Sequence, residues 1–333
     1  FFQAEDGIRH SVASRGLGDV YKRQVETNTG VLVDEENTGT NPLNKDSDGD
    51  VNADEFKKIV MGSPYQPDGT SILKAIKESS DDKGLITYDP RAERISKEDV
   101  IVAVVGENPY TEGVGDNPTI GLSSFDKAVL KRCYESGNKL VVVILSGRPL
   151  IIEDHLSKWD GLIAAWLPGM AGEGVSDVLY GDYSPTGKLS YSWPKNTSQL
   201  PLNEGDAKYD PLFPFGYGLS YSDFKYSNFS VSKDTFALSD TLNVGVFVTN
   251  ESDIDGYETI QVYSSDLYAS ITPDVKRLRD FTKIHIKAGE TKRLNFSLPV
   301  SELEFYNINN IPVVEEGRFR ITINDNAKEI YIK

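Results

Sequence analysis

The sequence is poor in cysteine. Cys133 is its only one, so no disulfide can form within the chain. The surrounding segment SSFDKAVLKRCYESG has helical periodicity, which indicates a buried thiol. Cysteine usage therefore does not decide between an oxidising and a reducing compartment.

Long apolar runs and an excess of positive charge are also missing. No stretch approaches the roughly 18 consecutive apolar residues of a membrane-spanning helix, so we predict no transmembrane helix and no membrane partner. The 51 acidic residues outnumber the 35 basic ones, which gives a formal charge of −16. This charge repels phosphate backbones and anionic membranes, so no nucleic-acid partner is expected.

Several catalytic and nucleotide-binding motifs are absent. GVGDNP lacks the third glycine of a dinucleotide fingerprint, and GDYSPTGKL has neither the spacing nor the Ser or Thr of a phosphate loop. There is no GxSxG motif. His10, His155 and His285 do not have the spacing of zinc ligands. A nucleotide-binding, flavodoxin-like module is therefore disfavoured.

The first 24 residues, FFQAEDGIRHSVASRGLGDVYKRQ, have unusual features. They contain no initiator methionine, no apolar signal core and no clear helical or strand period. The string resembles the conceptual translation of sequencing-adapter DNA, and a genuine disordered terminus is the alternative. We interpret residues 1–24 as a non-native segment and expect the natural N-terminal part to be missing.

Residues 69–221 alternate apolar runs with segments of helical period, which predicts an α/β fold: an open, mainly parallel sheet sandwiched by helices. In the central helix we expect Phe125, Val129 and Cys133 on one side. The predicted strands are VIVAVVG (100–106), KLVVVIL (139–145) and DGLIAAW (160–166), and the predicted helices are TSILKAIKES (70–79), LSSFDKAVLKRCYESG (122–137) and AGEGVSDVLYG (171–181).

Residues 222–333 have a different pattern, with short alternating strands separated by Asn, Asp, Gly and Pro and no evident helix. They predict an all-β sandwich of immunoglobulin or fibronectin type III character. We interpret the aromatic segment FPFGYGLSYSDFKYS (213–227) as a packed connector, although an ordinary domain edge would explain its aromatics equally well. The predicted strands are TLNVGVFVTN, ETIQVYSSD, FTKIHIKAG, TKRLNFSLP, GRFRITIND and KEIYIK.

A glutamate lies in the glycine-broken loop PYTEGVGDN (109–117), which closely follows the first predicted strand. Ligands of open parallel sheets bind beyond the carboxyl ends of the strands, where this loop is expected. Gly113 and Gly115 leave room for a ligand, and Asp116 adds a second carboxylate. Burial and a neighbouring negative charge would raise the pKa of Glu112, which suits a general acid. A solvated surface glutamate is the alternative.

Longer motifs resemble glycoside hydrolase family 3. PYTEGVGDN, ILSGRPLIIE, AAWLPGMAGEGVSDVLYGDYSPTGKLSYSWP and YDPLFPFGYGLSY resemble its C-terminal α/β domain. QVYSSD, DFTKIHIKAGETK and EEGRFRIT resemble its fibronectin type III-like domain. The resemblance extends over residues 69–221 and the sandwich after them, about four fifths of the chain.

In the branch of exo-β-glucanases and β-glucosidases, the resemblance implies that Glu112 is the general acid/base of retaining hydrolysis. It places the carboxylate nucleophile, which lies about 5 Å from the acid/base in such enzymes, on an N-terminal (β/α)8 barrel domain. A barrel takes roughly 200 residues or more, whereas 68 residues precede Gly69. We therefore expect this chain to lack half of the active site and to be almost inactive alone.

Other family-like positions are assigned no catalytic role. Trp166, Pro168, Gly169 and Glu173 lie in WLPGMAGEG, where packing and helix capping are sufficient explanations. Arg148 in SGRP would face a barrel or a sugar, or form a surface ion pair.

A second motif, NKDSDGDVNADE (44–55), has the spacing of a calcium loop, with glycine at its sixth position and glutamate at its twelfth. VDEENTGTNPL before it is not helical, so the motif resembles thrombospondin type 3-like or dockerin-like loops. An acidic solvated turn is the alternative. The predicted ligands are Asn44, Asp46, Asp48, Asp50 through its carbonyl, Asn52 and Glu55.

We thus predict four segments: a non-native stretch (1–24), a linker with the calcium loop (25–68), the α/β domain (69–221) and the sandwich (222–333). The predicted function is that of the C-terminal part of a secreted or periplasmic β-glucosidase or exo-β-glucanase. It would act on a β-glucan or oligosaccharide with no catalytic cofactor and with a structural Ca²⁺. The alternative is a non-catalytic, calcium-dependent carbohydrate-binding or adhesion module.

Overall fold

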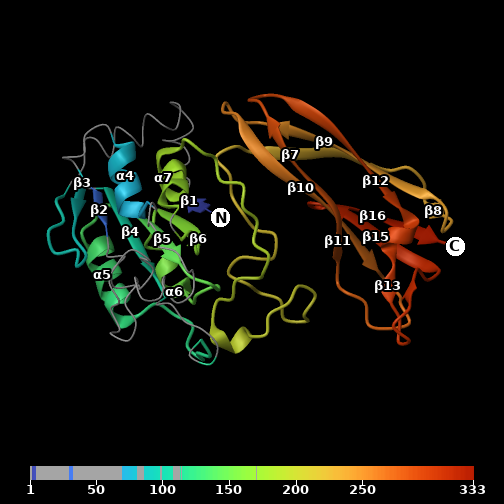
Figure 1. Cartoon of the computed structure of the whole chain (residues 1–333), viewed down its shortest axis with the longest axis horizontal. Helices are drawn as coiled ribbons and strands as arrows, with labels where there is room; N and C mark the ends of the chain where they lie inside the picture. Colours follow the sequence, from blue (N-terminus) through green and yellow to red (C-terminus); the bar gives the residue numbers. More distant parts are fainter. Residues whose placement is uncertain are drawn as a thin grey trace, which may run out of the picture. The chain divides into compact units, whose positions relative to one another are not determined.

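The computed structural model describes residues 2–4, 30–32, 70–80, 86–97, 100–107, 113, 115–169 and 171–333. The chain divides into two compact units, Phe1–Leu219 and Ser220–Lys333 (Figure 1). Among the described residues, no helix is long and apolar enough to cross a membrane.

The first unit is built on one sheet with the strand order β1-β6-β5-β4-β2-β3. Neighbouring strands from β6 to β3 run parallel, and β1 alone pairs antiparallel with its neighbour β6. The strands are β1 (Phe2–Ala4), β2 (Gly30–Leu32), β3 (Ile86–Tyr88), β4 (Val100–Gly106), β5 (Lys139–Leu145) and β6 (Gly161–Trp166).

Helices cover both faces of this sheet. Figure 1 shows α4 and α7 on one side and α5 and α6 on the other. The predicted open, mainly parallel α/β sheet is therefore confirmed. The helices are α4 (Ile72–Ser79), α5 (Ser124–Glu135), α6 (Glu153–Leu156) and α7 (Gly172–Tyr180), and a 3-10 turn, η2, spans Thr197–Gln199.

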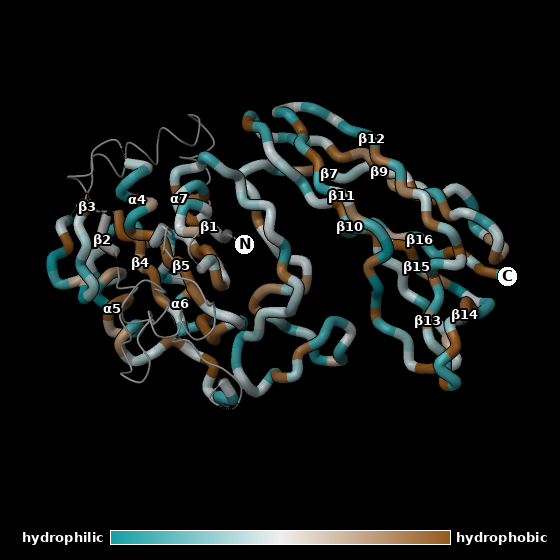
Figure 2. The backbone as a smooth tube through the Cα atoms, in the orientation of Figure 1, coloured by the Kyte–Doolittle hydropathy of each residue, from teal (hydrophilic) through white to brown (hydrophobic). Residues whose placement is uncertain are grey.

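The central strands form because they are apolar along their whole length. β4 is buried at every residue, and β5 is buried everywhere except at Lys139. These strands form the brown centre of the first unit in Figure 2. A strand that is buried on both faces needs such a continuous apolar run, because helices cover it above and below.

Helix α5 buries a slightly different face from the predicted one. Val129 and Cys133 are fully buried, but Phe125 is 38% exposed. Asp126 takes the inward position at this end of the helix. Its backbone N–H donates to the Ser123 hydroxyl oxygen (3.0 Å), and the Ser123 hydroxyl donates to its carboxylate (2.8 Å). The polar cap at the first turn therefore rotates the aromatic ring outward.

The second unit is a sandwich of two antiparallel layers, which confirms the predicted all-β fold. One sheet has the order β11-β10-β15-β16-β8, with β8 parallel to β16, and the other has the order β12-β9-β7. The strands are β7 (Phe224–Val231), β8 (Thr235–Phe236), β9 (Thr241–Asn250), β10 (Gly256–Asp266), β11 (Arg277–Ile286), β12 (Thr291–Pro299), β13 (Phe305–Tyr306), β14 (Pro312–Val313), β15 (Gly317–Ile323) and β16 (Asn326–Ile332). A 3-10 turn, η3, spans Val300–Leu303.

Strand β7 corrects the interpretation of segment 213–227 as a connector, because the sandwich already begins within it at Phe224. The pairing of β7 with β9 shifts register between Ser227 and Ser230. This bulge interrupts the alternation of buried and exposed side chains, which is the signal that identifies a strand in a sequence.

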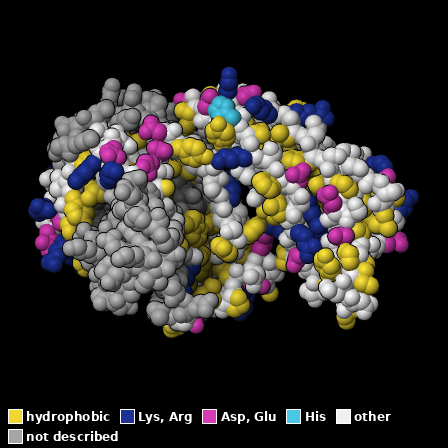
Figure 3. Space-filling view, viewed as in Figure 1, with side chains coloured by type: hydrophobic (Ala, Val, Ile, Leu, Met, Phe, Trp, Pro, Cys, Tyr) yellow, Lys and Arg dark blue, Asp and Glu magenta, His cyan; other side chains and the backbone are white. Residues whose placement is uncertain are grey.

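On the face of the sandwich that Figure 3 shows, charges of both signs lie among apolar side chains. The sandwich has exposed ion pairs, such as Arg320 with Glu329 (2.9 Å) and Arg277 with Asp274 (2.7 Å). Solvent screens pairs of this kind, so each adds little to stability.

Candidate active site

The carboxyl ends of β4, β5 and β6 meet at one edge of the parallel sheet. Two backbone hydrogen bonds extend the ladder just past the strands: Glu107 N–H donates to the Leu145 carbonyl (3.0 Å), and Ser146 N–H donates to the Trp166 carbonyl (3.0 Å). Open α/β sheets bind ligands at such an edge. The loop with Glu112 starts from it.

Gly106 allows the closest approach at this edge. A Cβ atom on Gly106 would lie 1.9 Å from the Leu145 carbonyl oxygen, so no side chain fits there without a shift of backbone. Gly113, on the far side of Glu112, has a φ of 78°, which glycine adopts without the strain that other residues incur. Glycine is therefore required for space at Gly106 and favoured by the backbone conformation at Gly113.

An ion pair joins the ends of two neighbouring strands. The Arg148 guanidinium donates to Oε1 of Glu107 from Nε (3.0 Å) and from Nη2 (2.7 Å). The Ser146 hydroxyl donates to the second carboxylate oxygen of Glu107 (2.8 Å). The Arg148 and Glu107 side chains are only 25% and 12% exposed. The pair is thus largely shielded from solvent, unlike the surface ion pair that was one sequence-based interpretation of Arg148.

The same guanidinium also holds the returning end of the loop. Nη1 of Arg148 donates to the Gly115 carbonyl (2.7 Å), and Asp116 N–H donates to the Gly113 carbonyl in a tight turn (3.1 Å). Arg148 therefore contacts the described residues on both sides of Glu112. Glu112 itself lies outside the described residues.

An aromatic cluster lies around Trp166 at the end of β6. Trp166, the last residue of β6, has a φ of 56°, which is unusual for a bulky side chain. Its ring packs 6.5 Å from Tyr191 and 6.0 Å from Trp193, measured between centroids. The indole N–H of Trp193 donates to the Leu150 carbonyl (2.7 Å). The packing interpretation of Trp166 fits these contacts.

Glu173 lies in the first turn of α7. A hydrogen bond from Thr70 lowers the pKa of its carboxyl, and a backbone hydrogen bond lowers it further. The partial positive charge of a helix N-terminus stabilises a carboxylate in this position. This geometry agrees with the capping interpretation of Glu173. It gives Glu173 no contact with Glu107, Ser146 or Arg148.

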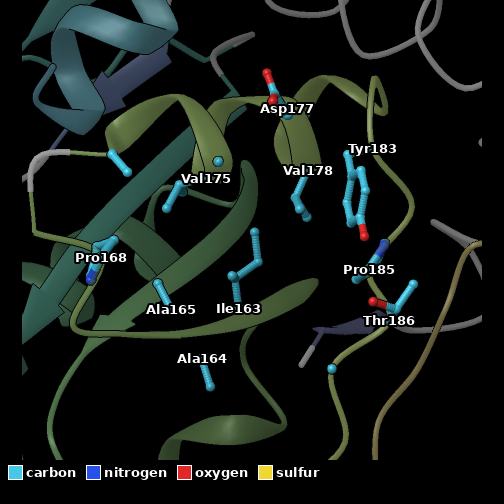
Figure 4. Close-up of a pocket in the computed structure, with 13 residues that line it drawn as sticks. Ile163, Ala164, Ala165, Pro168, Val175, Asp177, Val178, Tyr183, Pro185 and Thr186 are labelled. Atoms are coloured by element: carbon cyan, nitrogen blue, oxygen red, sulfur yellow. The ribbon is translucent and has the colours of Figure 1, made fainter. Parts of the chain in front are cut away.

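A cavity of about 430 Å³ lies between β6, α7 and the segment 183–187 (Figure 4). Ile163 and Val178 point toward each other across it. Among the described residues that line it, Asp177 supplies the one carboxylate, and burial, followed by the charges of Asp182 and Glu173, raises the pKa of that carboxyl. The lining is mostly apolar, although it includes the polar side chains of Asp177, Tyr183 and Thr186. It shares no residue with Glu107, Ser146 or Arg148, so the cavity is separate from the polar groups at the carboxyl edge of the sheet.

The predicted calcium ligands, residues 44–55, lie outside the described residues. Within the described part of the chain, no three His, Cys, Asp or Glu side chains are grouped closely enough to hold a metal ion. Sequence reasoning missed Glu107. An acid directly after one buried strand, with SGR directly after the next, was the available signal, because parallel neighbouring strands bring these positions together.

These features define a class of protein: a parallel α/β domain with a polar cluster at its carboxyl edge, followed by a β-sandwich. Residues 31–221 match the glycosyl hydrolase family 3 C-terminal domain, and residues 258–327 match the fibronectin type III-like domain. The chain belongs to glycosyl hydrolase family 3. The resemblance of its sequence motifs to that family is thereby confirmed.

Individual relatives agree with this assignment. A β-xylosidase of Formosa agariphila is 35% identical in an alignment of 246 positions that covers 69% of this chain and 34% of that protein. A periplasmic β-glucosidase of Salmonella typhimurium is 31% identical in an alignment of 305 positions that covers 78% of this chain and 40% of that protein. The crystal structure of a β-glucosidase from Listeria innocua in complex with isofagomine superposes with a TM-score of 0.71 and 28% identity, covering 92% of this chain and 46% of that one. The chain spans less than half the length of each.

Proposed function

We propose that the chain is the C-terminal part of a retaining β-glucosidase or exo-β-glucanase, with Glu112 as its general acid/base. The observation that carries this proposal is the anchoring of the Glu112 loop at the carboxyl edge of the sheet. Arg148 bridges Glu107 before the loop and Gly115 after it. A catalytic group needs a supporting structure of this kind, because proton transfer requires a defined geometry.

The proposed chemistry has two steps. In the first, the Glu112 carboxylic acid donates its proton to the departing glycosidic oxygen while an enzyme carboxylate attacks the anomeric carbon. In the second, the Glu112 carboxylate takes a proton from water, which attacks the same carbon and releases the sugar and the nucleophile. The stereochemistry at the anomeric carbon is retained.

The nucleophile is proposed to come from a (β/α)8 barrel domain outside this chain. The lengths of the relatives support this, since 54% or more of each lies outside the matched part. A purified chain of 333 residues is then expected to leave p-nitrophenyl β-glucoside intact. Rapid turnover by the chain alone would contradict the division of the active site between two domains.

The substrate is proposed to be a β-glucan or a β-linked oligosaccharide. The names of the relatives support β-linked sugars, because they include both β-glucosidases and β-xylosidases. A secreted or periplasmic location is proposed with it, since one relative is a periplasmic β-glucosidase. Release of glucose or xylose from matched aryl β-glycosides would decide between the two sugars.

The experiment that tests Glu112 is its replacement by alanine in the enzyme joined to the barrel. Turnover of cellobiose, which has a poor leaving group, should fall by about 10²- to 10⁴-fold. Formation of the glycosyl-enzyme from 2,4-dinitrophenyl β-glucoside should change little, because that leaving group needs no proton. With this activated substrate, added azide should attack the glycosyl-enzyme in place of water, restore its turnover and yield β-glucosyl azide. Glu135→Ala, an exposed glutamate on α5, is the control. Unchanged cellobiose turnover in Glu112→Ala would disprove the assignment.

Calcium binding by residues 44–55 is a second proposal, supported by the spacing of their oxygen ligands. Titration calorimetry on the chain should detect a site at or below millimolar Ca²⁺, and Glu55→Gln should weaken it. The absence of any heat of binding would contradict the proposal. Binding of β-glucan by the chain alone, dependent on Ca²⁺, would instead favour a non-catalytic carbohydrate-binding module.

A further inference from the structure

We propose that Arg148 is a positioning residue for the general acid/base Glu112, an inference that rests on the proposed function. Arg148 need not touch the substrate for this role. It fixes the path of the loop by holding the described residues at both of its ends.

The geometry of the guanidinium is suited to this task. Nε and Nη2 both donate to Glu107, the first residue after β4, while Nη1 donates to the Gly115 carbonyl. One planar, rigid group thus spans the start and the return of the loop. Arginine offers several donors in a fixed fork, whereas a lysine ammonium is a point charge on a flexible stem.

Ser146 ties this bridge to the sheet. Its hydroxyl donates to the second Glu107 oxygen (2.8 Å), and the Arg148 backbone N–H donates to the Ser146 hydroxyl oxygen (3.1 Å). Ser146 directly follows β5 and is buried, with 2% of its surface exposed. The ends of two central strands, β4 and β5, therefore fix the orientation of the Glu107 carboxylate. That carboxylate in turn fixes the orientation of Arg148.

Because the Arg148–Glu107 ion pair is little exposed, water cannot easily replace Arg148 when it is removed. Without Arg148, the Glu107 carboxylate loses its ionic partner, and the Gly115 carbonyl loses its guanidinium donor. The loop would then settle in other conformations, although Glu112 would still be present. A displacement of a catalytic group by 1 Å costs about 10²-fold in rate. The loss should fall on the steps in which Glu112 transfers a proton.

The kinetic test compares Arg148→Met with Arg279→Met in the enzyme joined to the barrel. Arg279 is a matched control because it is a half-buried arginine of the sandwich that donates to Ser264 (2.7 Å) and to the carbonyls of Glu302 and Leu303. For Arg148→Met, kcat/KM on cellobiose should fall by about 10²-fold, while kcat/KM on 2,4-dinitrophenyl β-glucoside changes little. Arg279→Met should show no such split between substrates.

Other variants separate failure of this inference from failure of the proposed function. Azide should restore the turnover of 2,4-dinitrophenyl β-glucoside in Glu112→Ala. It should not do so in Arg148→Met, because the Glu112 carboxylate is still present in that variant. If Glu112→Ala shows the leaving-group split and Arg148→Met does not, only the positioning role is disproved. If neither shows it, the proposed function fails as well. Arg148→Lys keeps the charge but cannot bridge both partners, so its loss on cellobiose should be intermediate.

A second measurement is made on the chain itself and needs no activity. Hydrogen exchange of peptides covering residues 107–116 should be faster in Arg148→Met than in the parent chain, and unchanged in Arg279→Met. Peptides from β5 and β9 serve as internal references for folding. Unchanged exchange at residues 107–116, in a variant whose reference peptides are also unchanged, would overturn the inference.

Discussion

The two units bury apolar side chains in different patterns. In the α/β unit, β4 is buried along its whole length. In the sandwich, β9 alternates buried residues with exposed or half-buried ones from Thr241 to Asn250. The first pattern is typical of a sheet covered on both faces, and the second of a sheet with one face in water.

This difference decides where polar groups meet. Strands that are apolar throughout leave polar side chains only at their ends, and parallel pairing brings these ends together, as at Glu107, Ser146 and Arg148. In the sandwich, polar side chains are spread along the outer faces, and its best-buried carboxylate, Glu258, accepts a hydrogen bond from Tyr226 (2.8 Å). The α/β unit therefore gathers polar side chains at one edge of its sheet, while the sandwich distributes them over its surface.

The largest expected effect breaks the sandwich alone. Phe319→Ala removes a side chain that is 1% exposed, and should lower the free energy of unfolding of that unit by about 3–5 kcal/mol. Hydrogen exchange should speed up in β15 and β16 but not in β4 and β5. Phe281→Ala is the control, since Phe281 lies in the same sheet and is 63% exposed. Equal loss of protection in both units would show that they unfold together.

A smaller effect is expected at the edge of the parallel sheet. Gly106→Ala places a Cβ 1.9 Å from the Leu145 carbonyl oxygen, so the strands must move apart. The free energy of unfolding of the α/β unit should fall by about 1–3 kcal/mol. The same substitution at Gly174, in α7, meets no atom within 4 Å and should be stabilising. Urea denaturation of both variants checks the opposite signs.

The partly buried hydrogen bond between Tyr226 and Glu258 is expected to stabilise the sandwich. Tyr226→Phe takes one donor from the buried Glu258 and should cost about 1–2 kcal/mol of unfolding free energy. Tyr331→Phe also removes a tyrosine–glutamate hydrogen bond, but that bond is exposed, and no measurable change is expected. Similar losses in the two variants would argue against burial as the cause.

The free energy of unfolding of the α/β unit should depend on pH through the ionisation of its buried thiol, Cys133. Burial raises the pKa of Cys133 to about 12 from its ordinary value of 9.0. The unfolded chain therefore ionises first, and the stabilisation is complete below pH 9 and is lost as the pH rises toward 12. By pH 10 the loss should be on the order of 1 kcal/mol relative to Cys133→Ala, which has no thiol to ionise. Parallel curves for parent and variant in urea denaturation would contradict it.

The regular parts of both units could be predicted from the sequence. The apolar runs of β4 and β5 and the alternation of β9 are strong signals, and the bounds of β9 and β12 equal the predicted segments. Local irregularities could not be predicted as well. Phe125 points outward because of a local cap, and β7 was not predicted because of its bulge.

The candidate site shows a second limit. Glu112 was proposed from a motif and stays a prediction, as do the calcium ligands. Arg148 was noticed, but its partner Glu107 was not, because the two are 41 residues apart in sequence. Their contact depends on which strands are neighbours and on their register, and neither follows from composition or periodicity.

The hydrogen bonds from Glu107 to Leu145 and from Ser146 to Trp166 close the core before the Glu112 loop begins. In evolutionary terms, they separate the stability of the fold from the length of the loop. Lengthening a loop of this size by two residues costs well under about 0.6 kcal/mol in closure entropy. Insertion of two glycines after Tyr110 should therefore leave urea denaturation almost unchanged. Changes in the length of this loop can then be inherited without loss of the fold.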